Sequence, residues 1–213
     1  TYRDGFYAYD DSKTIAIGDD GWPVPVTSDR IDLYFFGYNK NYEQCIKDLY
    51  KLTNPVPLLP RFALGNWWSR YHAYNDEEYY KLLDDFKAKN LPFSVAVIDM
   101  DWHITKTPDE IKYGAGWTGY TWNKELFPNP KEFLANLKKR GLRTTLNLHP
   151  RDGVRAYEDI YPKFCQRLGK DASEGKQIEF DASDRKFMEA YFDTVIRSLE
   201  DEGVDLDANH VTD

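Results

Sequence analysis

Cysteines, phosphate-binding loops and long apolar runs are scarce or missing in this sequence, and each absence excludes a class of protein. The 213 residues hold two cysteines, Cys45 and Cys165, which fit neither a disulfide framework nor a zinc-binding pattern. No uncharged apolar run approaches the ~20 residues of a membrane-spanning helix. Glycine-rich motifs that cradle phosphates are absent as well. We therefore expect a protein that uses no cofactor.

Basic residues are also outnumbered, since 28 Lys and Arg face 36 Asp and Glu and leave a formal net charge of −8. Phosphate groups bind to basic surfaces, so neither a nucleic acid nor an anionic membrane is an expected partner. No signal peptide is recognisable, which favours a cytoplasmic location. Because the chain begins at Thr1, without a methionine and within an apparent strand, we expect it to be part of a longer protein.

Aromatic residues, in contrast, are abundant: 6 Trp, 16 Tyr and 12 Phe make up 16% of the chain. Aromatic rings fill dense cores, and their faces also pack against the apolar faces of sugar rings. Composition alone favours the core over a carbohydrate site.

Two regions with different patterns meet at a proline-rich linker. The first alternates short β-branched and aromatic runs with polar turns, which predicts antiparallel strands and then a helix. These elements span 5–9, 14–17, 31–36 and 42–52. The linker, 54–60, holds three prolines and fits neither a helix nor a central strand. We therefore predict two domains, 1–54 and 55–213.

After the linker, strands and helices alternate as in parallel crossover units. The predicted strands are 62–68, 93–98, 142–148 and a fourth from Val204, and the predicted helices are 75–89, 129–140 and 184–201. Asn75 with Glu78 and Asn129 with Glu132 predict capping boxes on the first two helices. Four strands are about half of a (β/α)8 barrel. A smaller doubly wound sheet is the alternative, but its glycine-rich turn is missing after the first strand.

Polar and aromatic side chains gather where the predicted strands end, which is the end that carries the active site in a β/α barrel. The set holds acids, an amide, histidines and aromatics but no thiol, and it suits a neutral, hydroxyl-rich ligand. Its members are Trp67, Trp68, Asp99, Asp101, Trp102, His103, Asn147, His149, Arg151, Asp205, Asp207 and His210.

Asp99 and Asp101 form the sharpest local feature, because two acids end an apolar strand with one residue between them. Strand alternation would point both carboxylates to the same side, where they could bind sugar hydroxyls or transfer protons. The alternative is that one acid caps the next segment or pairs with Arg143 or Arg151. A metal site built from Asp99 with the two nearby histidines matches no known signature, so we expect no metal.

Longer motifs occur together and in a fixed order. They are Leu58–Tyr71, Val97–His103, Gly116–Asn123, Leu126–Pro130 and Leu146–Pro150, with Asp10–Lys13 and Asp32–Gly37 upstream. Together they resemble glycoside hydrolase family 31: the first half of its catalytic (β/α)8 barrel, preceded by the end of its antiparallel β-sandwich. The fold class implied is α/β, with a partial TIM barrel.

The resemblance implies a retaining α-glucosidase or α-xylosidase that acts on α-linked glycosides. Asp99 matches the family's carboxylate that holds hydroxyls of the sugar, and Asp101 and Asn147 match neighbouring positions. Trp67 and Trp68 match positions near the pocket.

The chain departs from the family pattern after Asp205. His210 occupies the place of the nucleophilic aspartate, Asp207 is an acid three residues early, and the strand of the acid/base lies beyond Asp213. We therefore expect a truncated hydrolase that is inactive alone, since retention requires two carboxylates. The alternatives are a non-catalytic carbohydrate-binding chain and a half-barrel that self-associates through its exposed edges.

Overall fold

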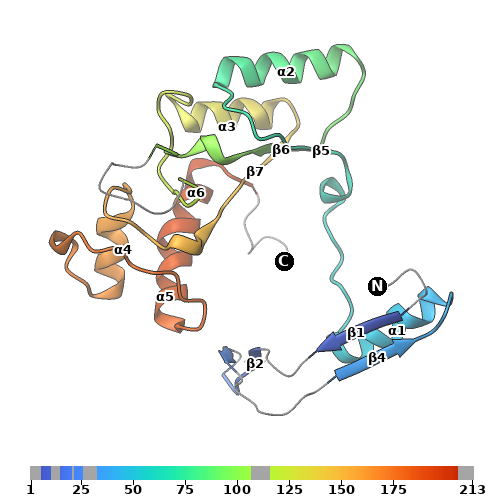
Figure 1. Cartoon of the computed structure of the whole chain (residues 1–213). Coiled ribbons are helices and arrows are strands. Elements are labelled where there is room, and N and C mark those ends of the chain that lie inside the picture. The colour runs from blue at the N-terminus through green and yellow to red at the C-terminus, as the bar shows by residue number, and fades with distance from the viewer. Residues whose placement is uncertain (1–5, 11–14, 21, 26–32, 107–115, 206–213) are drawn as a thin grey trace. The chain divides into compact units, whose positions relative to one another are not determined.

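The computed structural model describes residues 6–10, 15–20, 22–25, 33–106 and 116–205. The chain divides into two compact units, Thr1–Leu58 and Leu59–Asp213 (Figure 1). The assignment of 1–54 and 55–213 to separate domains stays a prediction.

The described residues of the first unit form two antiparallel ladders and one helix. β1 (Phe6–Asp10) pairs with β4 (Leu33–Gly37), and β2 (Ile15–Ile17) pairs with β3 (Pro23–Pro25). α1 (Tyr42–Thr53) follows and begins at a cap, where the Asn41 side chain accepts from the Gln44 N–H at 3.3 Å. The predicted strands and helix are confirmed where they fall on described residues. The predicted end of a β-sandwich is not confirmed, because the described residues form two separate two-stranded ladders rather than two packed sheets.

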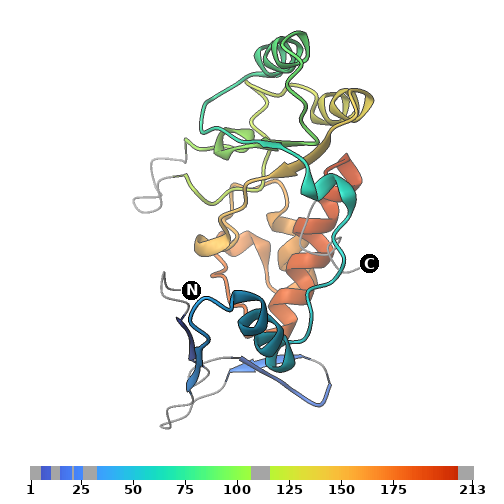
Figure 2. The same ribbon diagram turned by 90° about the vertical axis from the view of Figure 1, so that its right-hand side faces the viewer.

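The second unit is built on a parallel sheet with the order β5-β6-β7. The strands are β5 (Trp67–Trp68), β6 (Val95–Ile98) and β7 (Arg143–Leu146), in a register that sets Trp67 beside Val95 and Val95 beside Arg143. α2 (Asp76–Ala88) and α3 (Pro130–Lys139) make the crossovers and lie on the same face of the sheet (Figures 1 and 2). Parallel strands joined by helices confirm the predicted α/β class.

The main core lies between this sheet and these two helices. All four residues of β6 are buried, as the unbroken apolar run predicts for a strand covered on both faces. Tyr79 of α2 also donates from its hydroxyl to the Val97 carbonyl at 3.1 Å, which ties the helix to the strand. The core residues include Tyr79, Leu83, Ala96, Ile98, Phe133, Leu134, Leu137 and Leu146.

The two predicted capping boxes differ. At α2 the Asn75 side chain accepts from the Glu78 N–H at 2.8 Å, and the Glu78 carboxylate accepts from the Asn75 N–H at 3.1 Å. At α3 the Glu132 N–H reaches Asn129 at 3.5 Å, but the Glu132 carboxylate accepts from the Asn129 side-chain amide at 3.0 Å instead of from the backbone. The capping box predicted at α2 is confirmed. At α3 the cap by Asn129 is present, but the predicted return bond from the Asn129 N–H to Glu132 is wrong.

The predicted first strand, 62–68, is too long. Its beginning is a 3-10 helix, η1 (Arg61–Leu64), because the Ala63 N–H donates to the Pro60 carbonyl and the Gly65 N–H to the Phe62 carbonyl. These local bonds replace ladder bonds and leave only Trp67 and Trp68 in the sheet. The shorter 3-10 helices are η2 (Met100–Trp102), η3 (Pro150–Asp152) and η4 (Ala172–Glu174).

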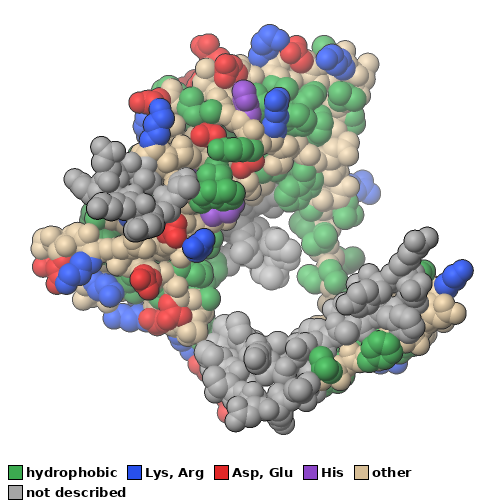
Figure 3. Space-filling view, viewed as in Figure 1, with side chains coloured by type: hydrophobic (Ala, Val, Ile, Leu, Met, Phe, Trp, Pro, Cys, Tyr) green, Lys and Arg blue, Asp and Glu red, His purple; other side chains and the backbone are tan. Residues whose placement is uncertain are grey.

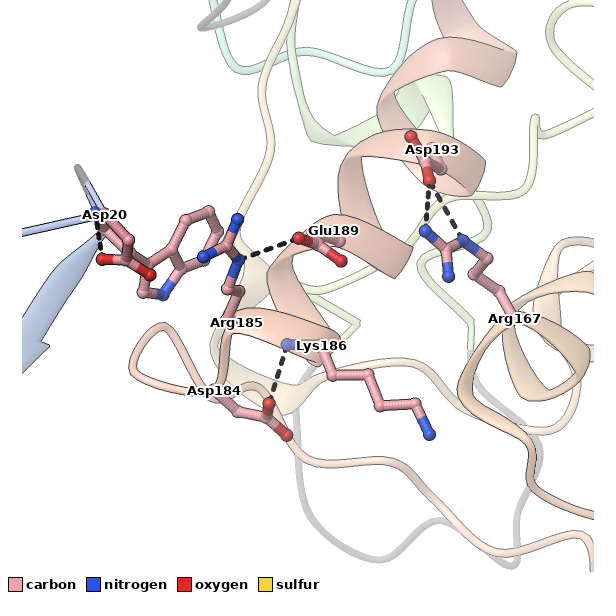
Figure 4. A network of polar contacts seen from close by, with 8 residues as sticks. Asp20, Arg167, Asp184, Arg185, Lys186, Glu189 and Asp193 are labelled. Atoms are coloured by element: carbon pink, nitrogen blue, oxygen red, sulfur yellow. Dashed lines mark hydrogen bonds and ion pairs between the residues drawn. The ribbon is translucent and has the colours of Figure 1, made fainter.

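The predicted helix 184–201 is a continuous helical segment with a π-helical middle. It consists of α5 (Arg185–Ala190), the π-helix η5 (Tyr191–Ile196) and α6 (Arg197–Glu202), and it stops at Gly203, whose φ of 116° is in the left-handed region. The Asp184 side chain caps it by accepting from the Lys186 N–H at 2.9 Å, and Arg185 pairs with Glu189 one turn on (Figure 4).

A helix that the sequence analysis did not predict packs beside this segment. α4 (Tyr161–Leu168) shares a second core cluster with it, and the Arg167 guanidinium donates to the Asp193 carboxylate at 3.0 and 2.9 Å (Figure 4). After α6, the Asp205 N–H donates to the Thr144 carbonyl at 3.0 Å, where a fourth strand would join β7. Val204 and Asp205 are not part of a strand, and residues 206–213 lie outside the described residues.

Candidate functional site

Asp99 follows directly after β6 and is held by two uncharged donors. The Met100 N–H donates to it at 2.8 Å and the Asn147 side-chain amide at 2.6 Å. Both bonds end on Oδ1. The other oxygen, Oδ2, accepts from no residue that the structure describes, although a carboxylate has about four acceptor sites. Half of the acceptor capacity of this partly buried carboxylate is therefore unused among the described residues.

Asp101 lies beside the same cavity as Asp99, but strand alternation is not the reason. Alternation ends at Ile98, because Asp99 is the N-cap of η2 and the chain turns there. The reason given for both acids pointing one way is therefore wrong, and the alternative that one acid caps the next segment is confirmed. Even so, Asp99 and Asp101 line one small cavity, together with Arg70, His72 and Tyr74.

Neither acid pairs with the arginines named as alternatives. Arg143 pairs with Asp205 at 2.7 Å, and Arg151 lies 3.9 Å from Asp152. Figure 3 shows acidic, histidine and hydrophobic side chains close together on the visible face of the second unit.

Asn147 is fixed by its backbone on both sides. Its N–H donates to the Ile98 carbonyl at 3.0 Å, which extends the β6–β7 ladder by one bond, and its carbonyl accepts from the Trp102 indole at 2.9 Å. With the backbone fixed in this way, the side-chain amide gives one hydrogen to Asp99 and keeps a second N–H and its oxygen.

His149 lies two residues further on and contacts the loop that precedes α3. The Thr118 hydroxyl donates to the His149 carbonyl, and it accepts from the Asp152 N–H at 3.2 Å. The ring of Trp117 lies edge-on to the His149 ring, with 5.2 Å between centroids. These contacts connect the loops that follow β6 and β7.

The two tryptophans of β5 lie in different surroundings. Trp68 packs on Phe86 and Phe93 in the layer between sheet and helices, with ring centroids 4.7 and 6.0 Å away. Trp67 is 45% exposed, and its indole donates to the Ala63 carbonyl at 3.1 Å. Neither residue lines the cavity around Asp99.

His103 is fully buried, and burial lowers the pKa of its ring. Its Nδ1 lies 3.0 Å from the Ile104 carbonyl. Within the described ranges, no three His, Cys, Asp or Glu side chains come together as metal ligands would.

Glu158 is a second carboxylate with neutral partners, but it is buried. It accepts from the Tyr120 N–H at 3.1 Å and from the Thr121 hydroxyl at 2.6 Å. Burial raises its pKa, while these hydrogen bonds act in the opposite direction. The Thr121 hydroxyl also accepts from the Asp159 N–H at 2.9 Å, so Glu158 ties segment 118–121 to segment 158–159.

Sequence reasoning did not single out four residues that the structure brings into view, two of which line the cavity with Asp99 and Asp101. Arg70 and His72 lie two and four residues after the end of β5, so the strand-end rule would have found them. Trp117 and Glu158 lie inside loops and carry no comparable signal. Of the remaining predicted residues, Asp205 lies beside the first residues of β7, at the opposite end of the sheet from Asp99, and Asp207 and His210 fall outside the described residues.

Comparison with known proteins identifies the family of the chain. A family model for the glycosyl hydrolases family 31 TIM-barrel domain matches residues 56–207. The chain belongs to glycoside hydrolase family 31. Among curated family members, the α-xylosidase of Saccharolobus solfataricus is 29% identical over 145 residues, which are 67% of this chain and 18% of that protein. The α-glucosidase 2 of Bacillus thermoamyloliquefaciens is 29% identical over 120 residues, or 56% of this chain and 14% of that protein.

A solved family 31 α-xylosidase from a soil metagenome, complexed with xylose, shows the same fold. The TM-score is 0.62 at 17% identity, and the match covers 94% of this chain and 30% of that one. The chain therefore spans between 14% and 30% of the length of these three proteins. None of the helices in the described part of the chain combines the length and apolar character that crossing a membrane requires.

Proposed function

We propose that the Asp99–Asn147 pair is the sugar-binding part of a family 31 glycosidase that acts on α-linked glucosides or xylosides. The observation that carries this proposal is the unused Oδ2 of Asp99, which lies at the carboxyl end of a buried parallel strand. Ligands bind at this end of the strands in β/α barrels. Two curated relatives, an α-xylosidase and an α-glucosidase, support the substrate class.

The pair has the chemistry that a neutral polyol requires. A sugar hydroxyl both donates and accepts. Asp99 Oδ2 takes a donated hydrogen, while Asn147 keeps one N–H to donate and an oxygen that accepts. Asp101 lines the same cavity and adds a second acid. Two carboxylates against one arginine, Arg70, line that cavity and disfavour a phosphorylated or acidic sugar, so the proposed ligand is an uncharged glycoside.

The proposed reaction is hydrolysis with retention of the anomeric configuration. It requires a nucleophilic carboxylate and an acid/base about 5 Å apart. Asp99 is assigned to binding because both its contacts serve to hold it in place. In the family register His210 takes the place of the nucleophile and Asp207 is an acid three residues earlier. We therefore propose that these 213 residues bind the glycoside but turn it over negligibly by themselves.

Calorimetric titration with xylose and glucose tests the binding half of the proposal, and release of aryl alcohol from an aryl α-xyloside or α-glucoside tests the catalytic half. Binding without turnover is the expected result. Absence of binding to both sugars would refute the site, and measurable turnover would refute the inactivity of this chain.

His210 at the nucleophile position favours one second candidate, a non-catalytic carbohydrate-binding protein that uses the same pair. In-frame sequence that follows Asp213 and encodes the rest of a barrel would support the enzyme, and its absence from the gene would support the binding protein. Light scattering reports whether the chain self-associates through strand edges, as a half-barrel would.

A further inference from the structure

We propose that Trp102 is a positioning residue for the sugar site: its indole holds Asn147 in place, and Asn147 in turn holds the Asp99 carboxylate. This inference rests on the proposed function of the Asp99–Asn147 pair and deepens it. Trp102 lines the same cavity as Asp99 but is 0% exposed, so its effect on a ligand is exerted through Asn147.

Trp102 connects the two residues of the pair in a closed cycle. Asp99 is the N-cap of η2, and the Trp102 N–H donates to the Asp99 carbonyl at 3.0 Å. The Trp102 indole donates to the Asn147 carbonyl at 2.9 Å. The Asn147 side-chain amide then returns to Asp99 Oδ1 at 2.6 Å. Three hydrogen bonds therefore link the end of β6 to the end of β7 through one side chain.

The indole bond does what the sheet does not do for Asn147. The β6–β7 ladder holds its N–H, which donates to the Ile98 carbonyl at 3.0 Å, but β7 itself ends at Leu146. The bond from Trp102 lies on the carbonyl and so fixes the peptide plane that follows Asn147. With both peptide planes around its Cα held, the direction of the Asn147 side chain toward Asp99 is set.

Trp102 is itself held by the core. Its ring lies edge-on to that of Trp122, with 5.0 Å between centroids and an interplanar angle of 69°, and its carbonyl accepts from the Asn123 N–H at 2.8 Å. Close-packed interiors leave such a side chain little room to move. An amide fixed through this indole is preorganised, which reduces the entropy lost when a ligand binds.

Trp122 shows why the acceptor matters more than the hydrogen bond. Buried indoles usually find an acceptor, so a bond alone assigns no role. Trp122 is 4% exposed in the same core, and its indole donates to the Glu202 carboxylate of α6 at 2.5 Å. The acceptor of Trp102 is instead the residue whose side chain contacts Asp99.

The test compares Trp102→Phe with the matched control Trp122→Phe, because each keeps a ring in the core and removes one indole N–H. Both variants should lower the melting temperature. In calorimetric titrations with xylose and glucose, W102F should weaken binding about fivefold, the equivalent of one neutral hydrogen bond. W122F should stay within about twofold of the parent affinity.

A second readout needs no sugar. In the NMR spectrum of the ligand-free chain, the bond to Asp99 separates the two proton signals of the Asn147 side-chain amide. W102F should narrow that separation, and W122F should preserve it. A parent-like separation in W102F, or equal losses of affinity in the two variants, would overturn the positioning role and leave the Asp99 site standing.

The parent chain provides a third measurement that does not depend on how well a variant folds. The Trp102 indole N–H signal should shift when xylose is added, while that of Trp122 stays in place. A Trp102 signal that stays fixed while the Asn147 amide shifts would overturn the positioning role. Failure of the parent to bind xylose or glucose would overturn the proposed function, and the amide signals of the ligand-free variants would still decide whether Trp102 positions Asn147.

Discussion

The two ends of the parallel sheet each carry an aspartate, and their surroundings differ. At the amino end, Asp205 has both oxygens engaged: Oδ1 with the Arg143 guanidinium at 2.7 Å and Oδ2 with the Thr144 N–H at 3.1 Å. At the carboxyl end, Asp99 receives two neutral donors on one oxygen and keeps the other. Asp205 pairs with a cation and has a hydrogen bond on each oxygen, whereas Asp99 forms no ion pair and has both hydrogen bonds on one oxygen among the described residues.

This difference suits the two ends of the sheet to different roles, one in stability and the other in ligand binding. In β/α barrels the amino end serves stability and the carboxyl end serves ligands. Asp205 fastens the segment after α6 to β7, so its removal should act on folding. Asp99 forms no ion pair among the described residues, although Arg70 lines the same cavity, so its removal should act on a ligand. The following predictions test that division.

The largest expected effect is the loss of sugar binding in Asp99→Ala. Hydrogen bonds to a charged group contribute about 1.5–3 kcal/mol, so xylose or glucose affinity should fall more than tenfold in calorimetry. Asp205→Ala is the matched control at the other end of the sheet and should keep the parent affinity. Equal losses in the two variants would remove the distinction between the ends.

Glu158→Ala should destabilise the chain by about 2–3 kcal/mol, measured by urea unfolding, because it leaves the buried Tyr120 N–H and Thr121 hydroxyl without their acceptor. Glu158→Gln retains an oxygen acceptor without the charge and should be far less destabilising.

Comparison of Glu158→Gln with the parent chain also predicts how the stability changes with pH. Burial raises the folded-state pKa of Glu158 above its unfolded value, so its contribution to stability is complete below the unfolded pKa and is lost as the pH rises through the folded pKa. E158Q lacks this loss. The melting temperature of E158Q should therefore rise relative to that of the parent as the pH increases from acidic to neutral. A difference that stays constant with pH would show that Glu158 does not titrate in this window.

Asp205→Ala should lower the free energy of unfolding by about 1–2 kcal/mol, since it breaks one partly exposed ion pair and one backbone hydrogen bond. Urea unfolding measures this, with Arg143→Ala as the matched variant on the other side of the pair. If D205A changed the free energy of unfolding by less than about 0.5 kcal/mol, as an ordinary surface substitution does, this end of the sheet would be held by packing alone.

The smallest expected effects come from the two helix caps. Asn75→Ala breaks a complete capping box and should cost about 1 kcal/mol, whereas Asn129→Ala breaks a cap with one long backbone bond and should cost about 0.5 kcal/mol. The order of the two melting temperatures is the measurement. Reversal of that order would show that cap geometry does not control these helix starts.

Sequence reasoning succeeded where the signal is local and repeated. β6 is an unbroken apolar run, and α2 and α3 combine an apolar stripe with a cap. It failed at residues 61–64, where 3-10 bonds replace strand pairing. It also missed α4, although Tyr161, Phe164, Cys165 and Leu168 are buried at helical spacing. Pro162 obscures that pattern, yet proline is permitted in the first turn of a helix.

The candidate site divides in the same way. Asp99, Asp101 and Asn147 follow strands and were predicted from that position, because the end of a buried strand fixes where its next residue lies. Glu158 and Trp117 depend on contacts between loops about 30 to 40 residues apart, such as Tyr120 with Glu158 and Trp117 with His149. No local pattern records such contacts.

Backbone and side-chain amide NMR spectra during a xylose titration test the central claim most directly. The account predicts that the Met100 N–H and the Asn147 side-chain amide, which both donate to Asp99, shift as xylose is added, while the Thr144 and Asp205 N–H signals at the other end of the sheet stay in place. Shifts at Thr144 and Asp205 without shifts at Met100 and Asn147 would contradict it.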